Sequence, residues 1–375
     1  MPSSPYLLSL ISGSSRKEQE LSTSAFVRLL SGWRQAKLPP RLGGLGIHSP
    51  ADCAVAAFVA ASWAVDESFT RIHGSELPRD VYRDEARARL QTLFGGEGPA
   101  VGMAQRDISQ EQQAVLVENF VAHMVPADQA RFRAANACWL TWGVSGSTAA
   151  AMLPAVGNMT PAEMRAALAY QLGLPVFGEG ETECCYCGGR LDAGGVHAVN
   201  CKIGPTRNRR HNAVRDWFAE AAAGAGLPAS VEVRCPGHPE IRTDVVIEAT
   251  RPLAIDFGIV NPLAGDYFPR SARDGTLAQR VYADEKSASQ AQAFAAAGWD
   301  FVPAVCSTFG RWDDRAMPIF QLVAEHLARR ANVEAPFVRS KLIHALSFVR
   351  MRGVARCIVA RRTPAQLEGL AVLRV

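Results

Sequence analysis

The sequence predicts an α+β protein with a helical N-terminal region, a small metal-binding knuckle, a mixed α-β-β-β-α-β segment and closing C-terminal helices. Three observations support this order. The first 175 residues show mostly helical apolar spacing, broken by turns rich in proline and glycine. Residues 184–201 combine cysteines, a histidine and several glycines. After residue 229, short apolar runs typical of strands surround one long Ala-rich helical segment.

Size, charge and cysteine usage restrict the class of protein. The chain has 375 residues, 48% of them hydrophobic and 20% charged, which suits two or three globular domains. Its net charge of +4 permits a nucleic-acid partner without requiring one. Nine cysteines, mostly isolated, argue against a disulfide framework and for a reducing compartment. The apolar stretch from Cys53 to Val65 is too short to cross a bilayer, and no leader is evident, so we expect a soluble intracellular protein.

The N-terminal region, residues 1–175, is expected to be helical. Within residues 24–36, helical spacing places four apolar side chains on one face: Phe26, Leu29, Leu30 and Trp33. Thr160 precedes Pro161 as a helix cap. Further helices are expected at 51–66, 111–123 and 126–142, with loops near 95–101 and 143–159.

The knuckle, residues 176–205, has the ligand spacing of a zinc site. Its candidate ligands form a C-x2-C-x9-H-x3-C pattern: Cys184, Cys187, His197 and Cys201. Zinc binds four such ligands in a tetrahedron, and a C-x2-C turn supplies two thiolates at once. The glycines between them let the backbone bend around the ion. Cys185 is a spare thiol that could replace Cys184.

Two nearby features allow more than one interpretation. Cys235 and His238 could form half of a second metal site, but a turn between strands is favoured because no partner pair lies nearby. His211 could cap a helix, contact phosphate or join a metal centre.

The mixed segment, residues 206–312, begins with a helix over 209–223. Strands are expected in SVEVR, TDVVIEA and LAIDFGIV, then a helix over 276–297 and a fourth strand in FVPAVCSTF. Two more helices, at 314–331 and 335–358, lie in a basic C-terminal region, residues 313–375.

Two aspartates lie in the apolar strands. Asp244 begins the second strand, Asp256 lies within the third, and the intervening EATRP indicates a hairpin that would bring them together. A carboxylate inside an apolar strand is costly unless it is paired or bound to a metal. Magnesium prefers carboxylate oxygens, and it can polarise a phosphodiester and activate water. The pair therefore predicts a magnesium site for phosphodiester cleavage.

This arrangement is typical of a restriction-endonuclease-like, PD-(D/E)xK-type domain. The usual pattern is an acid, one residue and a lysine, but Gly258 stands at the lysine position. Lys286 on the following helix could supply the ammonium group instead, or it could belong to a solvated helix face. Glu220, or Asp216 one turn earlier, is a candidate for a further catalytic acid. Glu248 could face either the metal or water.

Basic residues beside the knuckle are candidates for phosphate contact. They are Arg207, Arg209, Arg210 and Arg215, together with His211. The alternative is that these arginines are solvated residues at a helix start. The C-terminal helices add further basic residues for which we expect the same role: Arg339, Lys341, Arg350, Arg352 and Arg356.

Four parts of the chain resemble the C-terminal region of non-LTR retrotransposon proteins that carry a restriction-like endonuclease. LPPRLGGLGIHSPADCAVAAFVAASWA is similar to the stretch after the polymerase, and TPAEMRAALAYQLGLP to the helix before the knuckle. Residues 184–218 resemble the knuckle and its following helix. Residues 243–263 and 282–312 resemble the nuclease.

The resemblance implies a role for each candidate. It implies zinc on the four knuckle ligands, and catalysis by Asp244, Asp256 and Lys286. Two departures are a longer gap before His197 and Thr243 in place of the usual proline. No YxDD-type acid pair is present, so reverse transcription is not expected of this chain.

The expected function is nicking of target DNA, with DNA and element RNA as partners, no membrane association and a nuclear location. The alternative is a catalytically inactive, zinc-dependent nucleic-acid-binding module from a truncated element.

Overall fold

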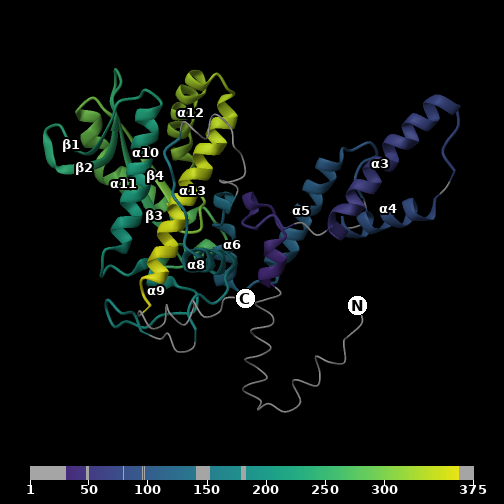
Figure 1. The fold of residues 1–375 in the computed structure, drawn as a ribbon, viewed down its shortest axis with the longest axis horizontal. Coiled ribbons are helices and arrows are strands. Elements are labelled where there is room, and N and C mark those ends of the chain that lie inside the picture. Colours follow the sequence, from purple (N-terminus) through teal and green to yellow (C-terminus); the bar gives the residue numbers. More distant parts are fainter. Residues whose placement is uncertain are drawn as a thin grey trace, which may run out of the picture. The chain divides into compact units, whose positions relative to one another are not determined.

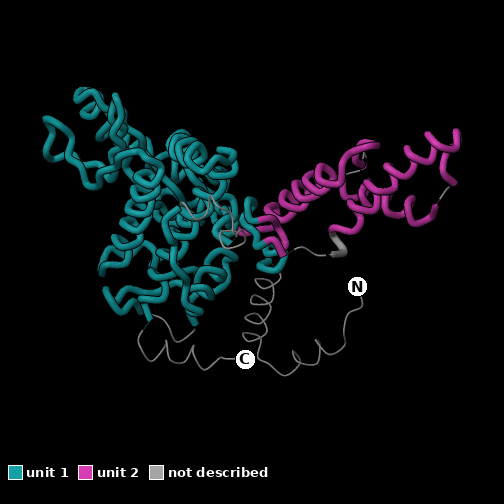
Figure 2. The backbone as a smooth tube through the Cα atoms, turned by 45° about the horizontal axis from the view of Figure 1, so that its top comes forward, with its two compact units in different colours: residues 1–36, 40–45, 126–375 teal, residues 37–39, 46–125 magenta. Residues whose placement is uncertain are grey.

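The computed structural model describes residues 31–47, 50–78, 80–94, 96, 98–140, 153–178 and 183–362. The chain divides into two units (Figure 2). We call residues 37–39 and 46–125 the helical unit, and the rest the sheet unit. The division falls at Pro126 and not at residue 175 as expected. The reason is that residues of the 161–172 helix, among them Ala166 and Tyr170, are buried in a core of the sheet unit.

The helical unit contains α3 (Pro50–His73), α4 (Val81–Leu93) and α5 (Gln105–Ala122). Its core joins Val59 and Trp63 of α3 to Leu90 of α4 and Ile108 of α5. The sequence did not predict α4, because its segment is rich in charged residues and carries a weak apolar pattern. Tertiary contact supports it instead: its buried Arg83 forms an ion pair with Asp66 of α3.

The sheet unit is built on four strands within the described residues: β1 (Ala229–Cys235), β2 (His238–Ile247), β3 (Leu253–Val260) and β4 (Asp300–Ser307). Their spatial order is β1-β2-β3-β4. The first two pairings are antiparallel, and β3 pairs with β4 in parallel. The crossover between β3 and β4 contains α11 (Leu277–Ala296). The fold is therefore mixed α+β, as the sequence predicted.

Helices cover both faces of this sheet (Figure 1). On one face lie α10 (Thr206–Gly224), α12 (Met317–Ala331) and α13 (Ala335–Val359), which share one apolar core with alternate residues of β2, β3 and β4. Phe218 and Phe257 meet there with ring centroids 5.2 Å apart. On the other face, Phe294 of α11 packs with Ala254 of β3. Alternation along β3 thus turns Asp256 toward the α11 layer.

α13 belongs to two cores. Its first half packs Leu342 and Leu346 onto the sheet, and its second half packs Met351 and Ile358 among α8 (Pro161–Leu172) and α9 (Val196–Asn200). The predicted cap on α8 is a full capping box between Thr160 and Glu163. Remaining short elements are α6 (Pro126–Arg133), η1 (Pro40–Leu42), η3 (Gly265–Tyr267), η4 (Arg270–Ala272) and η5 (Asp314–Ala316).

Some of the helix and loop bounds expected from the sequence differ from the structure, and others fall on residues that the structure does not describe. The helix expected over 126–142 ends at Arg133. In the expected helix over 24–36, residues 31–36 are helical, whereas Phe26, Leu29 and Leu30 lie outside the described residues. Much of the expected 143–159 loop also lies outside them, as do residues 363–375. Among the described residues, no helix has both the length and the apolar character needed to span a membrane.

Candidate functional site

Asp244 and Asp256 lie on neighbouring strands and are brought together with Lys286. Val245 of β2 pairs with Ile255 of β3 in an antiparallel register. Asp244 immediately precedes Val245 and Asp256 immediately follows Ile255, so the two aspartates lie opposite each other. Lys286 of α11 donates from Nζ to Asp256 Oδ2 at 2.7 Å. Gln290, one turn further along α11, donates from Nε2 to the same oxygen at 3.0 Å. We call this group, together with His211, the acid cluster.

The Asp244 carboxylate is held by two contacts. His211 Nε2 at the start of α10 lies 2.9 Å from Asp244 Oδ1. The backbone N–H of Phe257 donates to Asp244 Oδ2 at 2.6 Å. Among the three alternatives for His211, the structure thus places it beside the acids and not in the knuckle. The position of Asp244 is set by both α10 and β3.

Burial makes the two carboxyl groups electrostatically different. Burial raises the pKa of Asp256 to about 6, because its effect and that of the adjacent Asp244 outweigh the attraction of Lys286. For Asp244, burial is opposed by the hydrogen bond and charge of His211, and its pKa is held below the ordinary value. An extra cation between the two carboxylates would relieve the repulsion that raises the pKa of Asp256.

The structure explains why lysine is absent from β3. A Cβ atom added to Gly258 would lie 2.8 Å from the ring of Tyr282 and 3.0 Å from Val305. The aromatic ring occupies the space that a side chain at this position would need. Lys286 lies one turn after Tyr282 on α11, with Nζ 5.2 Å from the centre of that ring. The helix thus delivers the ammonium group that the strand cannot.

The four knuckle residues converge as the sequence predicted. One ligand atom from each of Cys184, Cys187, His197 and Cys201 lies within 4.8 Å of all the others. Burial opposes ionisation of Cys184, but backbone N–H groups of Tyr186 and Cys187 and the His197 ring outweigh it and lower the pKa of its thiol to about 6. A thiolate-bearing Cys3His cluster could hold a metal ion and is compatible with zinc.

Local backbone features position the knuckle ligands. Gly188 has a positive φ of 67°, which closes the C-x2-C turn. A Cβ on Gly189 would lie 2.9 Å from the His197 ring and 3.2 Å from Cys187 Sγ, so only glycine leaves the metal site open. Asp192 accepts hydrogen bonds from the backbone N–H groups of Val196 and His197 at 2.9 and 2.7 Å. That contact fixes the start of α9 and hence the position of His197.

The knuckle is attached to the end of α13. The Arg361 guanidinium lies 4.5 Å from the centre of the Tyr186 ring and donates to the carbonyl of Ile203 at 3.1 Å. The spare thiol, Cys185, donates to the carbonyl of Ala360 at 3.3 Å. Cys185 is therefore not a metal ligand in this arrangement; its role is to join the knuckle to α13.

Three candidate acids are not brought to the acid cluster. Glu220 is exposed and lies nine residues after His211, which places it roughly 13 Å further along α10 and on the opposite face. The prediction of Glu220 as a catalytic acid is therefore not supported. Asp216 is an exposed partner of Arg215. Glu248 follows the end of β2 and faces water.

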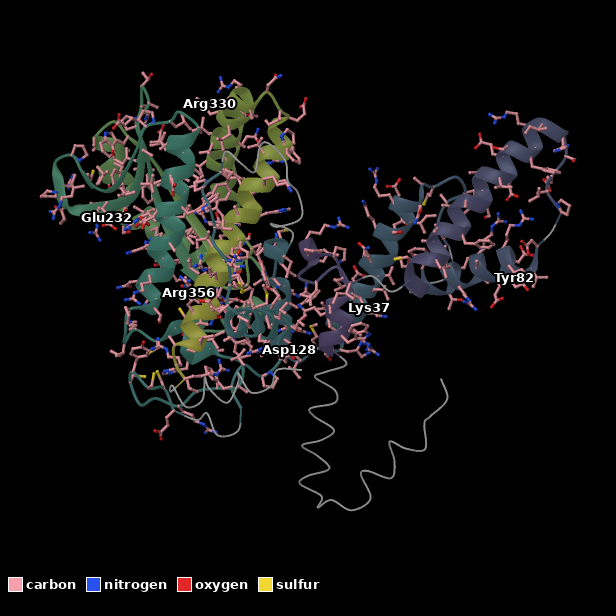
Figure 3. The ribbon with its side chains drawn as sticks, viewed as in Figure 1. Lys37, Tyr82, Asp128, Glu232, Arg330 and Arg356 are labelled. Carbon is pink, nitrogen blue, oxygen red and sulfur yellow. The ribbon has the colours of Figure 1, made fainter. Side chains whose placement is uncertain are left out.

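The predicted phosphate-binding arginines separate into two groups. Arg207 and Arg209 are exposed. Arg210 and Arg215 are buried, so neither is available for phosphate, and this part of the prediction is corrected. Arg210 packs against Gly353 of α13, and Arg215 binds the carboxylate of Glu232 on β1. Glu232 is labelled in Figure 3.

The C-terminal helix α13 requires a similar correction. Arg350 is fully buried and donates to the carbonyl of Thr308, and Arg356 pairs with Glu163 of α8. Arg352 donates to the carbonyl of Val156. These three arginines attach α13 to its neighbours, although Arg356 itself remains exposed. Of the other two basic residues of this set, Arg339 is exposed and Lys341 is half-buried.

Sequence reasoning missed Gln290. Its spacing of four residues from Lys286 on a helix was the available signal, because residues so spaced share one face. The favoured interpretation of Cys235 and His238 agrees with the structure: they pair across a tight β1–β2 turn at Pro236 and Gly237. Neither belongs to a metal-binding group among the described residues.

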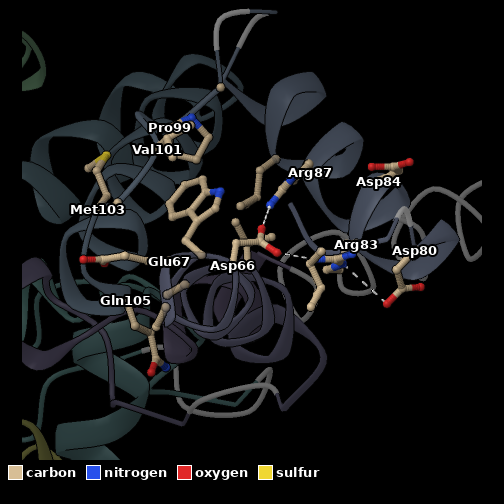
Figure 4. A pocket seen from close by; sticks show the side chains of 18 of the residues that line it. Asp66, Glu67, Asp80, Arg83, Asp84, Arg87, Pro99, Val101, Met103 and Gln105 are labelled. Carbon is tan, nitrogen blue, oxygen red and sulfur yellow. Dashed lines mark hydrogen bonds and ion pairs between the residues drawn. The ribbon is translucent and has the colours of Figure 1, made fainter. Parts of the chain in front are cut away.

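The helical unit contains a large open pocket of about 1310 Å³ between α3, α4 and the segment before α5 (Figure 4). Some of its charged lining residues are paired with one another. Asp66 accepts from Arg83 and Arg87, and Asp80 contacts Arg83. We assign no chemistry to this pocket.

No known family model matches the chain, and no curated protein matches it. The function is therefore inferred from the two clusters themselves.

Proposed function

We propose that this chain nicks DNA by metal-dependent hydrolysis of a phosphodiester bond at the acid cluster. One observation carries the proposal: the buried carboxylate of Asp256 binds Lys286 and lies beside the partly buried carboxylate of Asp244. Ionisation of the buried Asp256 opposes folding, and a buried acid paired with a lysine and a second acid suits phosphoryl chemistry.

The fold supports the same proposal. The order α10-β1-β2-β3-α11-β4 is the one expected of restriction-endonuclease-like domains. The acids lie on the second and third strands, and the lysine lies on the helix that follows. By the resemblance to retrotransposon proteins, the substrate would be a chromosomal target.

Each residue of the acid cluster has a distinct proposed role. A divalent ion held by Asp244 and Asp256 would polarise the scissile phosphate and lower the pKa of a bound water. Lys286 and Gln290 hold Oδ2 of Asp256, which leaves Oδ1 for the ion. The Lys286 ammonium also stabilises negative charge on the phosphate. His211 keeps Asp244 ionised and oriented.

The knuckle is proposed to be a structural zinc site that presents Arg207 and Arg209 to DNA. A second candidate function is zinc-dependent nucleic-acid binding without cleavage. It is favoured by one observation: within the described ranges, the knuckle alone has three or more metal-binding side chains close together.

Nicking of supercoiled plasmid DNA with Mg²⁺ or Mn²⁺ distinguishes the two. Asp256→Asn should abolish nicking while DNA binding persists. Asp300→Asn is the matched control, since Asp300 is exposed on β4 and paired with Arg251. A wild type that is inert with both metals, or activity that survives Asp256→Asn, would favour the binding module.

A further inference from the structure

A groove opens beside the acid cluster, between the β1–β2 hairpin and α11. It measures about 590 Å³. The hairpin lines it with Arg234, Arg242 and the segment Pro239–Ile241, and α11 lines it with Ser289 and Gln290. We call it the hairpin groove.

Gln290 connects this groove to Asp256. Its Nε2 group donates to Asp256 Oδ2 at 3.0 Å, while the residue itself forms part of the groove wall. Its Oε1 atom is buried and has no hydrogen-bond partner among the described residues. The groove wall therefore includes a side chain that binds Asp256, so a ligand lying in the groove would lie next to the acid cluster.

The charges of the groove point to an anionic ligand. Arg234 and Arg242 are directly paired across β1 and β2, so both side chains lie on the same face. Like charges in this position destabilise a sheet. Glu232 binds Arg242 at 2.5 Å, whereas Arg234 donates to the neutral carbonyl of Pro239 at 2.8 Å. Glu240 also lines the groove, but it is paired with His238 at 3.2 Å.

We propose that the hairpin groove carries the DNA strand to be cut, with Arg234 and Arg242 binding backbone phosphates next to the scissile one. This inference rests on the proposed nuclease function. Phosphates would relieve the repulsion between the two arginines, and a strand in the groove would pass Gln290 on its way to Asp256. An open, polar groove between exposed arginines suits a nucleic-acid backbone better than a small apolar ligand.

The test is the salt dependence of DNA binding, measured without added magnesium on a fluorescein-labelled duplex of about 30 base pairs. An arginine that neutralises one phosphate contributes about 0.9 to the log–log salt slope. We expect Arg234→Gln and Arg242→Gln each to lower the slope by about that amount, and the double variant by about 1.8. Arg251→Gln is the matched control, because Arg251 is similarly exposed and ion-paired but lies beyond the opposite end of β2.

A second pair of variants avoids disturbing the hairpin. Ser289 is exposed in the groove, so Ser289→Glu should weaken DNA binding several-fold and Ser289→Lys should strengthen it. A double arginine variant with the wild-type slope, equal affinities for the two Ser289 variants, or a wild type without DNA binding would each overturn the inference. If the wild type nicks DNA but the double arginine variant keeps the wild-type salt slope, only the proposed role of the groove is refuted. If the double variant has a lowered slope but the wild type never nicks DNA, only the proposed nuclease function is refuted.

Discussion

Ionisation of Asp256 affects the free energy of folding. Its pKa rises from an ordinary 3.8 to about 6, so the folded protein keeps a proton that the unfolded chain releases. Stability of the metal-free protein should therefore fall as the pH rises from about 4 to about 6, because the unfolded state binds fewer protons in that window. Above it, the ionised carboxylate continues to destabilise the fold.

Asp256→Asn should remove this penalty, because asparagine imitates the protonated acid and can still bind Lys286 and Gln290. We expect the metal-free variant to be more stable than the wild type by about 1–3 kcal/mol at about pH 8, with little difference near pH 4. Urea unfolding at the two pH values measures this. Added Mg²⁺ should stabilise the wild type and not the variant; equal stability of both proteins at the higher pH would contradict the assignment.

A lysine at position 258 of β3 is not expected to replace Lys286. Lys286→Ala leaves Asp256 without its cation, so we expect slower nicking and a decrease in stability near pH 8 on the order of 3 kcal/mol. Adding Gly258→Lys should not restore nicking, because the Tyr282 ring fills the required space. The measurement is plasmid nicking by the single and double variants. Recovery of nicking in the double variant would contradict this prediction, because it would show that the Tyr282 ring moves aside for a side chain at position 258.

At the scale of elements, the knuckle and the end of α13 form one structural group. Cys187→Ser should release the bound metal and increase hydrogen exchange both in the knuckle and near residues 354–361, because Arg361 packs on Tyr186. Elemental analysis and hydrogen exchange measure the two effects. Cys185→Ser is the control and should keep the metal, since its thiol contacts the carbonyl of Ala360. Absence of metal from the control would redefine the ligand set.

The short helical segment at residues 31–36 is bound firmly into the sheet unit. Gln35 is fully buried; its Oε1 accepts from Arg131 at 2.7 Å, and its Nε2 donates to the carbonyl of Gly43 at 2.8 Å. Gln35→Ala leaves the buried guanidinium with fewer partners and should cost about 1–3 kcal/mol. Arg34→Ala, at an exposed neighbouring position, should change stability by less than about 0.5 kcal/mol. Thermal unfolding of the two variants measures this difference in stability, and an equal stability of both variants would contradict the prediction.

Local patterns predicted most elements of the sheet unit. The strands showed short apolar runs, and α8 carried its cap and proline in the sequence. α4 was missed because contacts with other helices support it: Leu90 packs in the core of the helical unit, and Arg83 forms an ion pair with Asp66 of α3. The overlong helix expected after residue 126 ends at Arg133, where the next residues hydrogen-bond to other segments, as Asn136 does with the carbonyl of Phe309.

Across the whole molecule, the features that the sequence predicted are those set by local pattern, and the features that it missed depend on packing. The convergence of the knuckle residues follows from their spacing. The catalytic role of Asp256, suggested by an acid within an apolar strand, stays a prediction. The burial of Arg210 and Arg215 could not be foreseen, because it depends on α13 and β1, which lie far away in sequence. Charged residues at a helix start look alike in a sequence whether they face water or a neighbouring helix.

The double role of α13 also has a consequence for how the protein is made. The helical unit is nearly continuous in sequence and can fold soon after residue 125 leaves the ribosome. The sheet unit must wait, because α13 completes both of its cores and supports the knuckle. At about 5–20 residues per second, translation from Cys201 to Arg361 takes roughly 10–30 s. During that interval the nascent chain would carry exposed thiols and an unfinished sheet, a period in which chaperones would have access to it.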